Sequence, residues 1–245
     1  MKLIKDLGRY LLMLKGMFSR PENGKMYWKE FMHQCNDIGI GSLGIVTIIS
    51  VFIGAVSTLQ TAYQLVSPLL PNTIIAQIVR DTVILEFAPT LTCIVLAGVV
   101  GSKIASELGN MRVSEQIDAL EIMGINTKSY LVGPKILAAV ITIPLLVILA
   151  MVLGIYGGRL ASTLGGILSG NTYDRGLLLD FIPKNVWFAL VKAYTFAFII
   201  SSVSSFYGYN VKGGSLEIGR ASTSAVITSC ILILFADYIL AFFIL

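Results

Sequence analysis

Charged residues are absent from long stretches of this chain, and those stretches predict membrane-spanning helices. The longest extends from Ile38 to Val79, well beyond the roughly 20 apolar residues that one crossing needs. Its first part predicts a complete span over residues 40–64. The second part is interrupted by Gln60, Gln64, Pro68 and Pro71. We therefore expect a turn or a re-entrant piece over residues 65–80, with a further short span as the alternative.

The remaining apolar runs predict four more spans, so the expected fold is an all-α integral membrane protein. The expected boundaries of the five spans are residues 40–64, 82–104, 133–156, 186–207 and 221–244. Residues 157–185 are rich in glycine and serine, and we expect them to form a loop. No internal repeat is evident, which favours one transmembrane domain over residues 38–245.

The N-terminal residues have a different pattern from the spans. Over residues 1–18, Leu7, Leu11 and other apolar residues recur at helical spacing, with basic residues between them. This pattern predicts an amphipathic helix that lies in the membrane interface; a helix packed on a partner protein is the alternative. We expect residues 19–37 to be a polar connector that contains a second interfacial segment around Trp28. Residues 1–37 thus form an N-terminal interfacial region.

Small residues recur at four-residue spacing within two of the predicted spans. Ala97, Gly101 and Ala105 follow one another at this interval, and so do Gly154 and Gly158. Such spacing allows the backbones of neighbouring helices to approach closely. We therefore expect tight helix contacts at these positions.

A charge-dense segment separates the second span from the third. Ser114 is the expected N-cap of a short polar helix, with Ile117 and Leu120 on one face and acidic residues on another. The acidic residues suit contact with a basic partner surface, and the apolar face needs a partner or a lipid interface. The charged residues of this segment are Glu107, Arg112, Glu115, Asp118 and Glu121.

Composition supports a membrane location and gives an orientation. Hydrophobic residues make up 56% of the chain and charged residues 13%, compared with about 25% charged in soluble domains. Lysine and arginine are concentrated in residues 1–37, 103–135 and 209–220, and such segments usually face the cytoplasm. We therefore expect a cytoplasmic N-terminus, an external C-terminus and a cytoplasmic charge-dense segment.

Three charged residues fall inside or near the ends of predicted spans: Glu86, Lys192 and Asp237. Charge within a membrane is costly and usually faces protein or a watery cavity. These residues are candidates for a lipid pathway, and a salt bridge that joins helices is the structural alternative. Lys192 lies near enough to the end of its span to extend toward water.

Known catalytic and metal-binding patterns are absent from the sequence. The chain contains no phosphate-binding loop, nucleophile elbow or zinc-protease motif, so we expect no catalytic residues and no cofactor. The three cysteines are isolated and have no metal-ligand spacing. The sequence therefore indicates a protein that is not itself an enzyme, and any ATP hydrolysis is expected on another chain.

The charge-dense segment also resembles a known family. The run Glu107-Leu108-Gly109-x-Met111-Arg112-Val113-x-Glu115-Gln116-Ile117-Asp118-Ala119-Leu120 is similar to the signature of the MlaE-like (YrbE) permeases. Further similarity occurs at Glu86-Phe87-Ala88-Pro89, over residues 208–226 and at Asp237-Tyr238. Val99 departs from the family pattern, which often has a basic residue there; Lys103, one turn further along, is a candidate replacement.

The resemblance implies a permease subunit of an ABC transporter that moves phospholipid or related lipids. It implies a homodimer in the bacterial inner membrane, an ATP-binding subunit that hydrolyses ATP and an MCE-domain partner on the outer side. The polar helix would be a coupling helix that docks into the ATPase. Its expected coupling residues are Glu107, Met111, Arg112, Glu115, Ile117, Asp118, Leu120 and Glu121. An ion-driven secondary transporter and a scaffold without transport activity are the alternatives.

Overall fold

The computed structural model describes residues 2–17, 24–65, 71 and 73–244. Over these residues the chain forms helices and short connections, with no strand. The elements in chain order are α1 (Lys2–Met17), α2 (Gly24–Gln64), α3 (Thr73–Thr82), η1 (Val83–Leu91), α4 (Thr92–Leu96), η2 (Ala97–Gly101), α5 (Ser102–Val113), α6 (Gln116–Ile122), η3 (Lys128–Val132), α7 (Gly133–Leu164), α8 (Gly170–Leu178), α9 (Pro183–Tyr209) and α10 (Ser215–Ile244).

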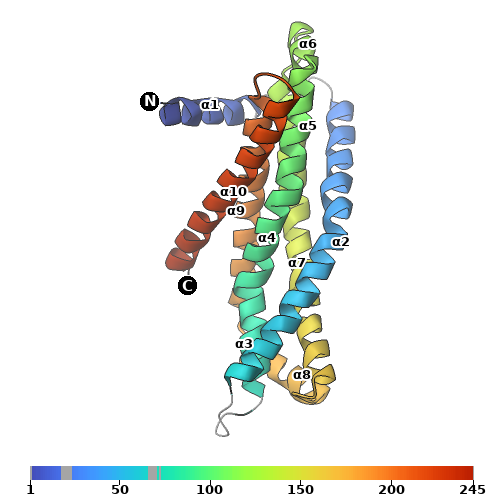
Figure 1. Cartoon of the computed structure of the whole chain (residues 1–245), viewed down its shortest axis with the longest axis vertical. Helices are drawn as coiled ribbons and strands as arrows, with labels where there is room; N and C mark the ends of the chain where they lie inside the picture. The colour runs from blue at the N-terminus through green and yellow to red at the C-terminus, as the bar shows by residue number, and fades with distance from the viewer. Residues whose placement is uncertain (1, 18–23, 66–70, 72, 245) are drawn as a thin grey trace. The chain divides into compact units, whose positions relative to one another are not determined.

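Five helical segments among the described residues are long and apolar enough to cross a membrane, which confirms the expected all-α fold with five spans. They are Gly24–Gln64, Thr73–Val113, Lys128–Leu164, Pro183–Tyr209 and Ser215–Ile244. The second contains the π-helical stretches η1 and η2, and the third begins with η3. Figure 1 shows the α-helices of these segments. One of the π-helical stretches, η1, contains Pro89, which has no backbone N–H for an α-helical hydrogen bond.

The helices extend beyond the apolar runs that predicted them. α2 begins at Gly24, so residues 24–37 are helical and not the expected connector. α3 is helical from Thr73, within the expected turn or re-entrant piece; residues 66–70 and 72 lie outside the described part. The expected loop over 157–185 contains the end of α7 and all of α8. Hydropathy marks the part of a helix that suits lipid, whereas backbone hydrogen bonds continue through polar residues in water.

The chain forms two compact units. Unit 1 comprises Met1–Ser42, Ile94–Ile143 and Tyr194–Tyr238, and unit 2 comprises Leu43–Cys93, Pro144–Ala193 and Ile239–Leu245. Each unit therefore combines segments that are distant in the sequence. The charge-dense segment lies wholly in unit 1.

Small residues bring helices of unit 1 into contact. A side chain at Gly208 would collide with the backbone of Ala105, and one at Gly101 would meet the hydroxyl of Ser204. These contacts join the segment around α5 to α9, and they confirm the role expected for Gly101. α1 is attached to the same helix, because the Tyr10 hydroxyl donates a 2.8 Å hydrogen bond to Ser202 Oγ.

In unit 2, α2 and α7 approach backbone to backbone. A methyl group at Gly54 would collide with the carbonyl of Gly154, and one at Gly157 would collide with the backbone of Val51. The close contact expected at Gly154 is therefore present. A separate apolar cluster joins α3 to α8, and the buried Arg80 guanidinium donates to the carbonyl oxygens of Leu177 and Leu179 at 2.8 and 2.7 Å.

Candidate functional site

The short polar helix α6 follows the end of α5 in unit 1 (Figure 1). Between the two helices Glu115 adopts a left-handed backbone conformation, with φ 58°. The Ser114 hydroxyl donates a 2.7 Å hydrogen bond back to the Asn110 carbonyl, so Ser114 ends α5. The expectation that Ser114 is the N-cap of the polar helix is wrong, because its side chain stabilises the preceding helix and α6 begins at Gln116.

The apolar residues of α6 do not form a single exposed face. Ile117 is completely buried within the chain, and Leu120 is half-buried. Ile122 and Met123, at the end of the helix, are 87% and 66% exposed. Ile117 therefore anchors α6 to its own unit, and the apolar surface available to a partner lies at Ile122 and Met123, which the sequence pattern did not single out.

The acidic residues of the segment have separate roles. Asp118 accepts a 2.6 Å hydrogen bond from the guanidinium of Arg112, and the two side chains form an ion pair. The same guanidinium lies 6.0 Å from the centre of the Tyr209 ring. Glu115 is exposed at the turn. Glu107 lies 2.7 Å from the Nζ atom of Lys135, whose side chain is almost fully buried. The structure thus brings Arg112 and Asp118 together as part of the α6 region and places Glu107 in a different cluster.

Glu121 accepts hydrogen bonds from within the chain. The Tyr209 hydroxyl donates to Glu121 Oε1 at 2.8 Å, the Thr127 hydroxyl donates to the same oxygen at 3.1 Å, and the two hydroxyl groups lie 2.8 Å apart. Because Tyr209 and Thr127 donate to the carboxylate, the pKa of Glu121 is lowered. The Glu121 carboxylate thus links α6 to the end of α9, while the residue remains exposed, so its expected contact with a partner stays a prediction.

Tyr209 and Thr127 were missed by the sequence reasoning. Both are buried, and neither stands out from its neighbours by charge or spacing. Met111, the remaining expected coupling residue, is half-buried next to Arg112. Only the packing of α6 against α9 shows which polar groups form this network.

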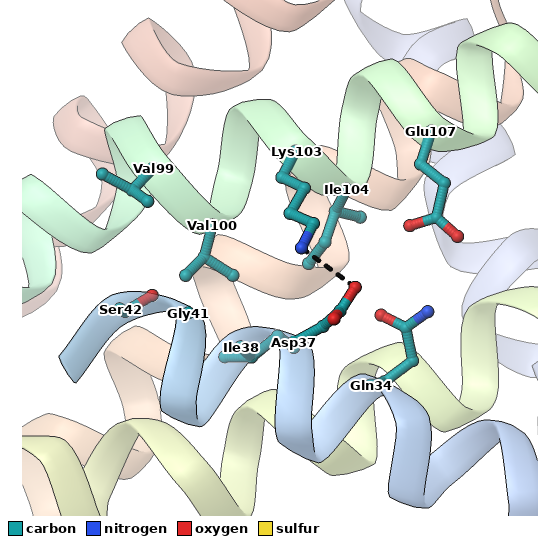
Figure 2. A pocket seen from close by; sticks show the side chains of 10 residues that line it. All are labelled: Gln34, Asp37, Ile38, Gly41, Ser42, Val99, Val100, Lys103, Ile104 and Glu107. Carbon is teal, nitrogen blue, oxygen red and sulfur yellow. Dashed lines mark hydrogen bonds and ion pairs between the residues drawn. The ribbon is translucent and has the colours of Figure 1, made fainter. Parts of the chain in front are cut away.

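A second cluster of charges surrounds a small cavity between α2 and α5 (Figure 2). The Lys103 Nζ atom donates to Asp37 Oδ2 at 2.9 Å, and Glu107 lines the same cavity. Val99 and Lys103 both line this cavity. Lys103, the candidate replacement for the basic residue that the family pattern often has at position 99, therefore shares a surface with that position. Asp37, Gln34 and Lys135 were not predicted. A useful signal is that Asp37 is the last charged residue before the long uncharged run.

In unit 2, Glu86 and Lys192 form a pair. The Lys192 Nζ atom lies 2.8 Å from Glu86 Oε1, 3.1 Å from the Leu85 carbonyl oxygen and 4.7 Å from the centre of the Phe188 ring. The Lys192 side chain is fully buried, so it does not extend toward water as was considered. Pro89 has no N–H to donate to the Leu85 carbonyl oxygen one turn back. The Lys192 ammonium donates a hydrogen bond to this oxygen. Asp237 belongs to unit 1 and is half-buried.

A larger, mostly apolar hollow lies within unit 2. Its volume is about 300 Å³. The lining comes from α2 and η1 and includes Phe52, Val56, Leu91 and Gln60. Phe87, the neighbour of Glu86 in the sequence, also lines it. Among the described residues, no group of three or more His, Cys, Asp or Glu side chains is arranged to hold a metal ion.

These features define a multi-pass membrane protein: five long apolar helices, an ion pair within the spans and a polar helix that follows one of them. The family model described as Permease MlaE matches residues 31–243. The chain therefore belongs to the MlaE permease family.

Individual relatives agree with this assignment. A "probable ABC transporter permease protein" of Rickettsia bellii is 36% identical, with 98% of this chain and 92% of that protein covered. The "intermembrane phospholipid transport system permease protein MlaE" of Haemophilus influenzae is 29% identical, with 96% and 90% covered. The Arabidopsis thaliana chloroplast protein TRIGALACTOSYLDIACYLGLYCEROL 1 is 32% identical, with 90% and 63% covered.

Proposed function

We propose that this chain is the permease subunit of an ABC transporter that moves phospholipid or a related lipid, with ATP hydrolysis on a separate subunit. The attachment and exposure of α6 carry the proposal. α6 directly continues the second span and is followed by η3, which begins the third. A force on α6 is therefore transmitted along the backbone to the second and third spans. It is also transmitted to α9 through the hydrogen bond between Tyr209 and Glu121.

The docking surface for the ATPase is the exposed end of α6. Ile122 and Met123 supply the apolar contact, with Leu120 at its edge and Glu115 as an exposed charge. Exposed charge pairs at the rim of an interface contribute little, whereas a buried apolar anchor dominates. Asp118 and Glu121 make hydrogen bonds within the chain that hold α6 in place. They therefore contribute to coupling by keeping α6 rigid.

The lipid path comprises the apolar hollow of unit 2, which Phe87 lines, and the ion pair of the neighbouring Glu86 with Lys192. Acyl chains suit the Phe52, Val56 and Leu91 walls, and the half-exposed Glu86 carboxylate supplies a polar group for the headgroup. Asp237, in unit 1, remains a proposed intramembrane charge of the last span. A hollow of this size is comparable to ligand pockets, which supports a path for part of a lipid.

The chain is proposed to function as a homodimer. In the most apolar stretch of α10, 11% of the residues are buried, compared with 56% in α9. A second copy along α10 would cover this surface, and the two copies would enclose an apolar cavity that opens outward. An MCE-domain protein is the proposed partner on the outer side, in a bacterial inner membrane.

The proposed orientation places the N-terminus in the cytoplasm and the C-terminus outside. α1 exposes Leu7, Leu11 and Leu12, which suits a helix in the membrane interface. Single cysteines at Asn110 and Thr172 test the orientation with an impermeant thiol reagent. Labelling of Thr172 from the cytoplasmic side would show that it is wrong.

Docking is tested by purifying the complex through this chain and identifying its subunits. Native complex should contain two copies of this chain and an ATP-binding subunit, and Ile122→Asp with Met123→Asp should release that subunit while the permease remains folded. Leu178→Asp, an exposed apolar residue of α8, is the matched control. An intact complex that still transports lipid after the double substitution would exclude α6 as the coupling element.

A further inference from the structure

The cavity between α2 and α5 lies where both helices change from charged to uncharged sequence. Asp37 precedes the uncharged run 38–79, and Lys103 follows the uncharged run 87–102. Their side chains form a 2.9 Å ion pair across the cavity (Figure 2). In a spanning helix this change marks the border between hydrocarbon and water, which is the level of the lipid headgroups.

The charges around the cavity are balanced. Two carboxylates, Asp37 and Glu107, face two ammonium groups, Lys103 and Lys135. The Lys103 side chain is 51% exposed, and those of Asp37 and Glu107 are also partly exposed. These three groups can therefore reach a ligand, whereas the side chain of Lys135 is buried behind Glu107.

The cavity has an apolar floor and a volume of about 60 Å³. Ile38, Val100 and Ile104 are buried along it, and Gln34 and Glu107 point into the same space from opposite helices (Figure 2). One water needs roughly 10 to 15 Å³ of such cavity space, so this cavity admits a small polar group. It is open beside Gly41, where an added Cβ atom would meet nothing within 4 Å.

We propose that this cavity binds the headgroup of a zwitterionic phospholipid that ends in a primary ammonium, as in phosphatidylethanolamine. The ammonium enters the cavity and donates to Glu107 and Asp37, and the phosphate accepts from Lys103. Lysine has three N–H donors, and each carboxylate has several acceptor positions, so these bonds add to the existing ion pairs. The acyl chains lie along the exposed apolar side chains of Ile40 and Val99.

The chemistry distinguishes this headgroup from other common ones. A trimethylammonium group has no N–H to donate to Asp37 or Glu107. A headgroup with a net negative charge would add an unbalanced charge to a cluster whose charges already cancel. The site goes beyond the proposed transport function, because it needs no docked ATPase and would exist if α6 had no coupling role.

The first test measures lipid binding to the full chain, purified with the subunits it retains, by native mass spectrometry in defined detergent. Dioleoyl phosphatidylethanolamine should bind about tenfold more tightly than dioleoyl phosphatidylcholine, as expected for loss of a charge-assisted hydrogen bond. Equal binding of the two lipids would overturn the proposal. Soluble phosphoethanolamine should not displace the lipid, because it lacks acyl chains; if it displaces the lipid at equal concentration, the site binds free headgroup and the lipid assignment is wrong.

The second test fills the cavity. Gly41→Leu should abolish the preference for phosphatidylethanolamine, whereas Gly44→Leu should keep it, because Gly44 also has open space but does not line the cavity. Equal thermal stability of the two variants shows that both are folded. If Gly41→Leu retains the preference, the cavity is not the binding site.

A third variant tests the charges without adding volume. Asp37→Asn should lower the affinity for phosphatidylethanolamine several-fold and leave phosphatidylcholine unchanged, because only the primary ammonium donates to this carboxylate. A fall of the same size for both lipids would show that the ion pair only holds α2 to α5, and the headgroup assignment would fail. The double substitution at Ile122 and Met123 should leave all of these lipid preferences unaltered.

Discussion

The hydroxyl of Tyr209 donates a 2.8 Å hydrogen bond to Oε1 of Glu121, and this bond joins the end of α9 to α6. Thr127, which precedes η3, shares the same carboxylate oxygen. Three parts of unit 1 thus meet at one acceptor. The position of α6 is therefore set by these hydrogen bonds as well as by its connections along the chain.

Tyr209→Phe should loosen α6 while the aromatic ring stays in place. The variant loses the hydroxyl that bonds to Glu121 and Thr127. We expect a loss of about 1.5 to 3 kcal/mol in local stability, the range for a hydrogen bond to a charged group. Amide hydrogen exchange over residues 116–122 measures this change. Tyr63→Phe, at an exposed position, should leave exchange unaltered. Unchanged protection in Tyr209→Phe would show that the bond does not hold α6.

The attachment of α6 to the end of α9 should depend on pH. The hydrogen bonds from Tyr209 and Thr127 lower the pKa of Glu121 below its usual value of 4.5. A carboxylate with a lowered folded-state pKa stabilises the fold above its unfolded pKa, and this contribution is lost as the pH falls through the folded pKa. Protection of α6, corrected for intrinsic exchange, should therefore be constant from neutral pH to about 5 and fall below about 4.

Glu121→Gln provides the control for this pH dependence. Its amide has no charge to titrate in this range, so the loss of protection in acid should be absent or much smaller than in the unmodified chain. A pH profile identical in both proteins would assign the acid sensitivity to another group. Glu121→Lys should disturb α6 more than the reversal of a surface charge that makes no hydrogen bonds, because the Glu121 carboxylate accepts hydrogen bonds from Tyr209 and Thr127.

The two isoleucines of α6 should respond differently to truncation. Ile117→Ala should cost about 2 to 5 kcal/mol, because it empties a buried site, whereas Ile122→Ala should change stability by less than about 0.5 kcal/mol. Thermal unfolding of the purified permease measures both. If Ile122→Ala proves as destabilising as Ile117→Ala, the end of α6 is packed within the chain and is no docking surface.

The Glu86–Lys192 pair should show mutual dependence in a double-mutant cycle. Glu86→Ala should destabilise the fold by about 1 to 3 kcal/mol, since a buried ammonium loses a charged acceptor. Lys192→Met keeps most of the buried volume and should cost less. In the presence of Lys192→Met, Glu86→Ala should cost little. Additive effects of the two substitutions would contradict a direct interaction.

The backbone contact between α2 and α7 predicts a strict size limit at Gly54. Gly54→Ala should destabilise the protein by about 1 to 3 kcal/mol, as overpacking does, because the new methyl group collides with the Gly154 carbonyl. Gly44→Ala adds the same group to the same helix in open space and should be neutral or slightly stabilising. Equal melting temperatures of the two variants would contradict the close approach.

The number of spans and the position of the polar helix could be predicted from the sequence because both depend on composition along the chain. Residues 38–79 contain no charge, and residues 107–121 contain most of the charge between the second and third spans. Lipid excludes charge and requires helical backbone hydrogen bonds, so this pattern alone determined an all-α membrane fold. The helix ends were less predictable, because polar residues such as those at 24–37 continue a helix as readily as they end one.

Only the tertiary structure decided which residues meet. Glu121 and Tyr209 are 88 positions apart, and Lys103 and Asp37 are 66 apart; no local pattern pairs them. Ile117 and Ile122 are both apolar residues of α6, yet one is buried and the other exposed. The sequence determined that a polar helix with apolar residues follows the second span. The packing of α6 against the end of α9 decided which of its side chains remain available, because burial depends on neighbours that are distant in the sequence.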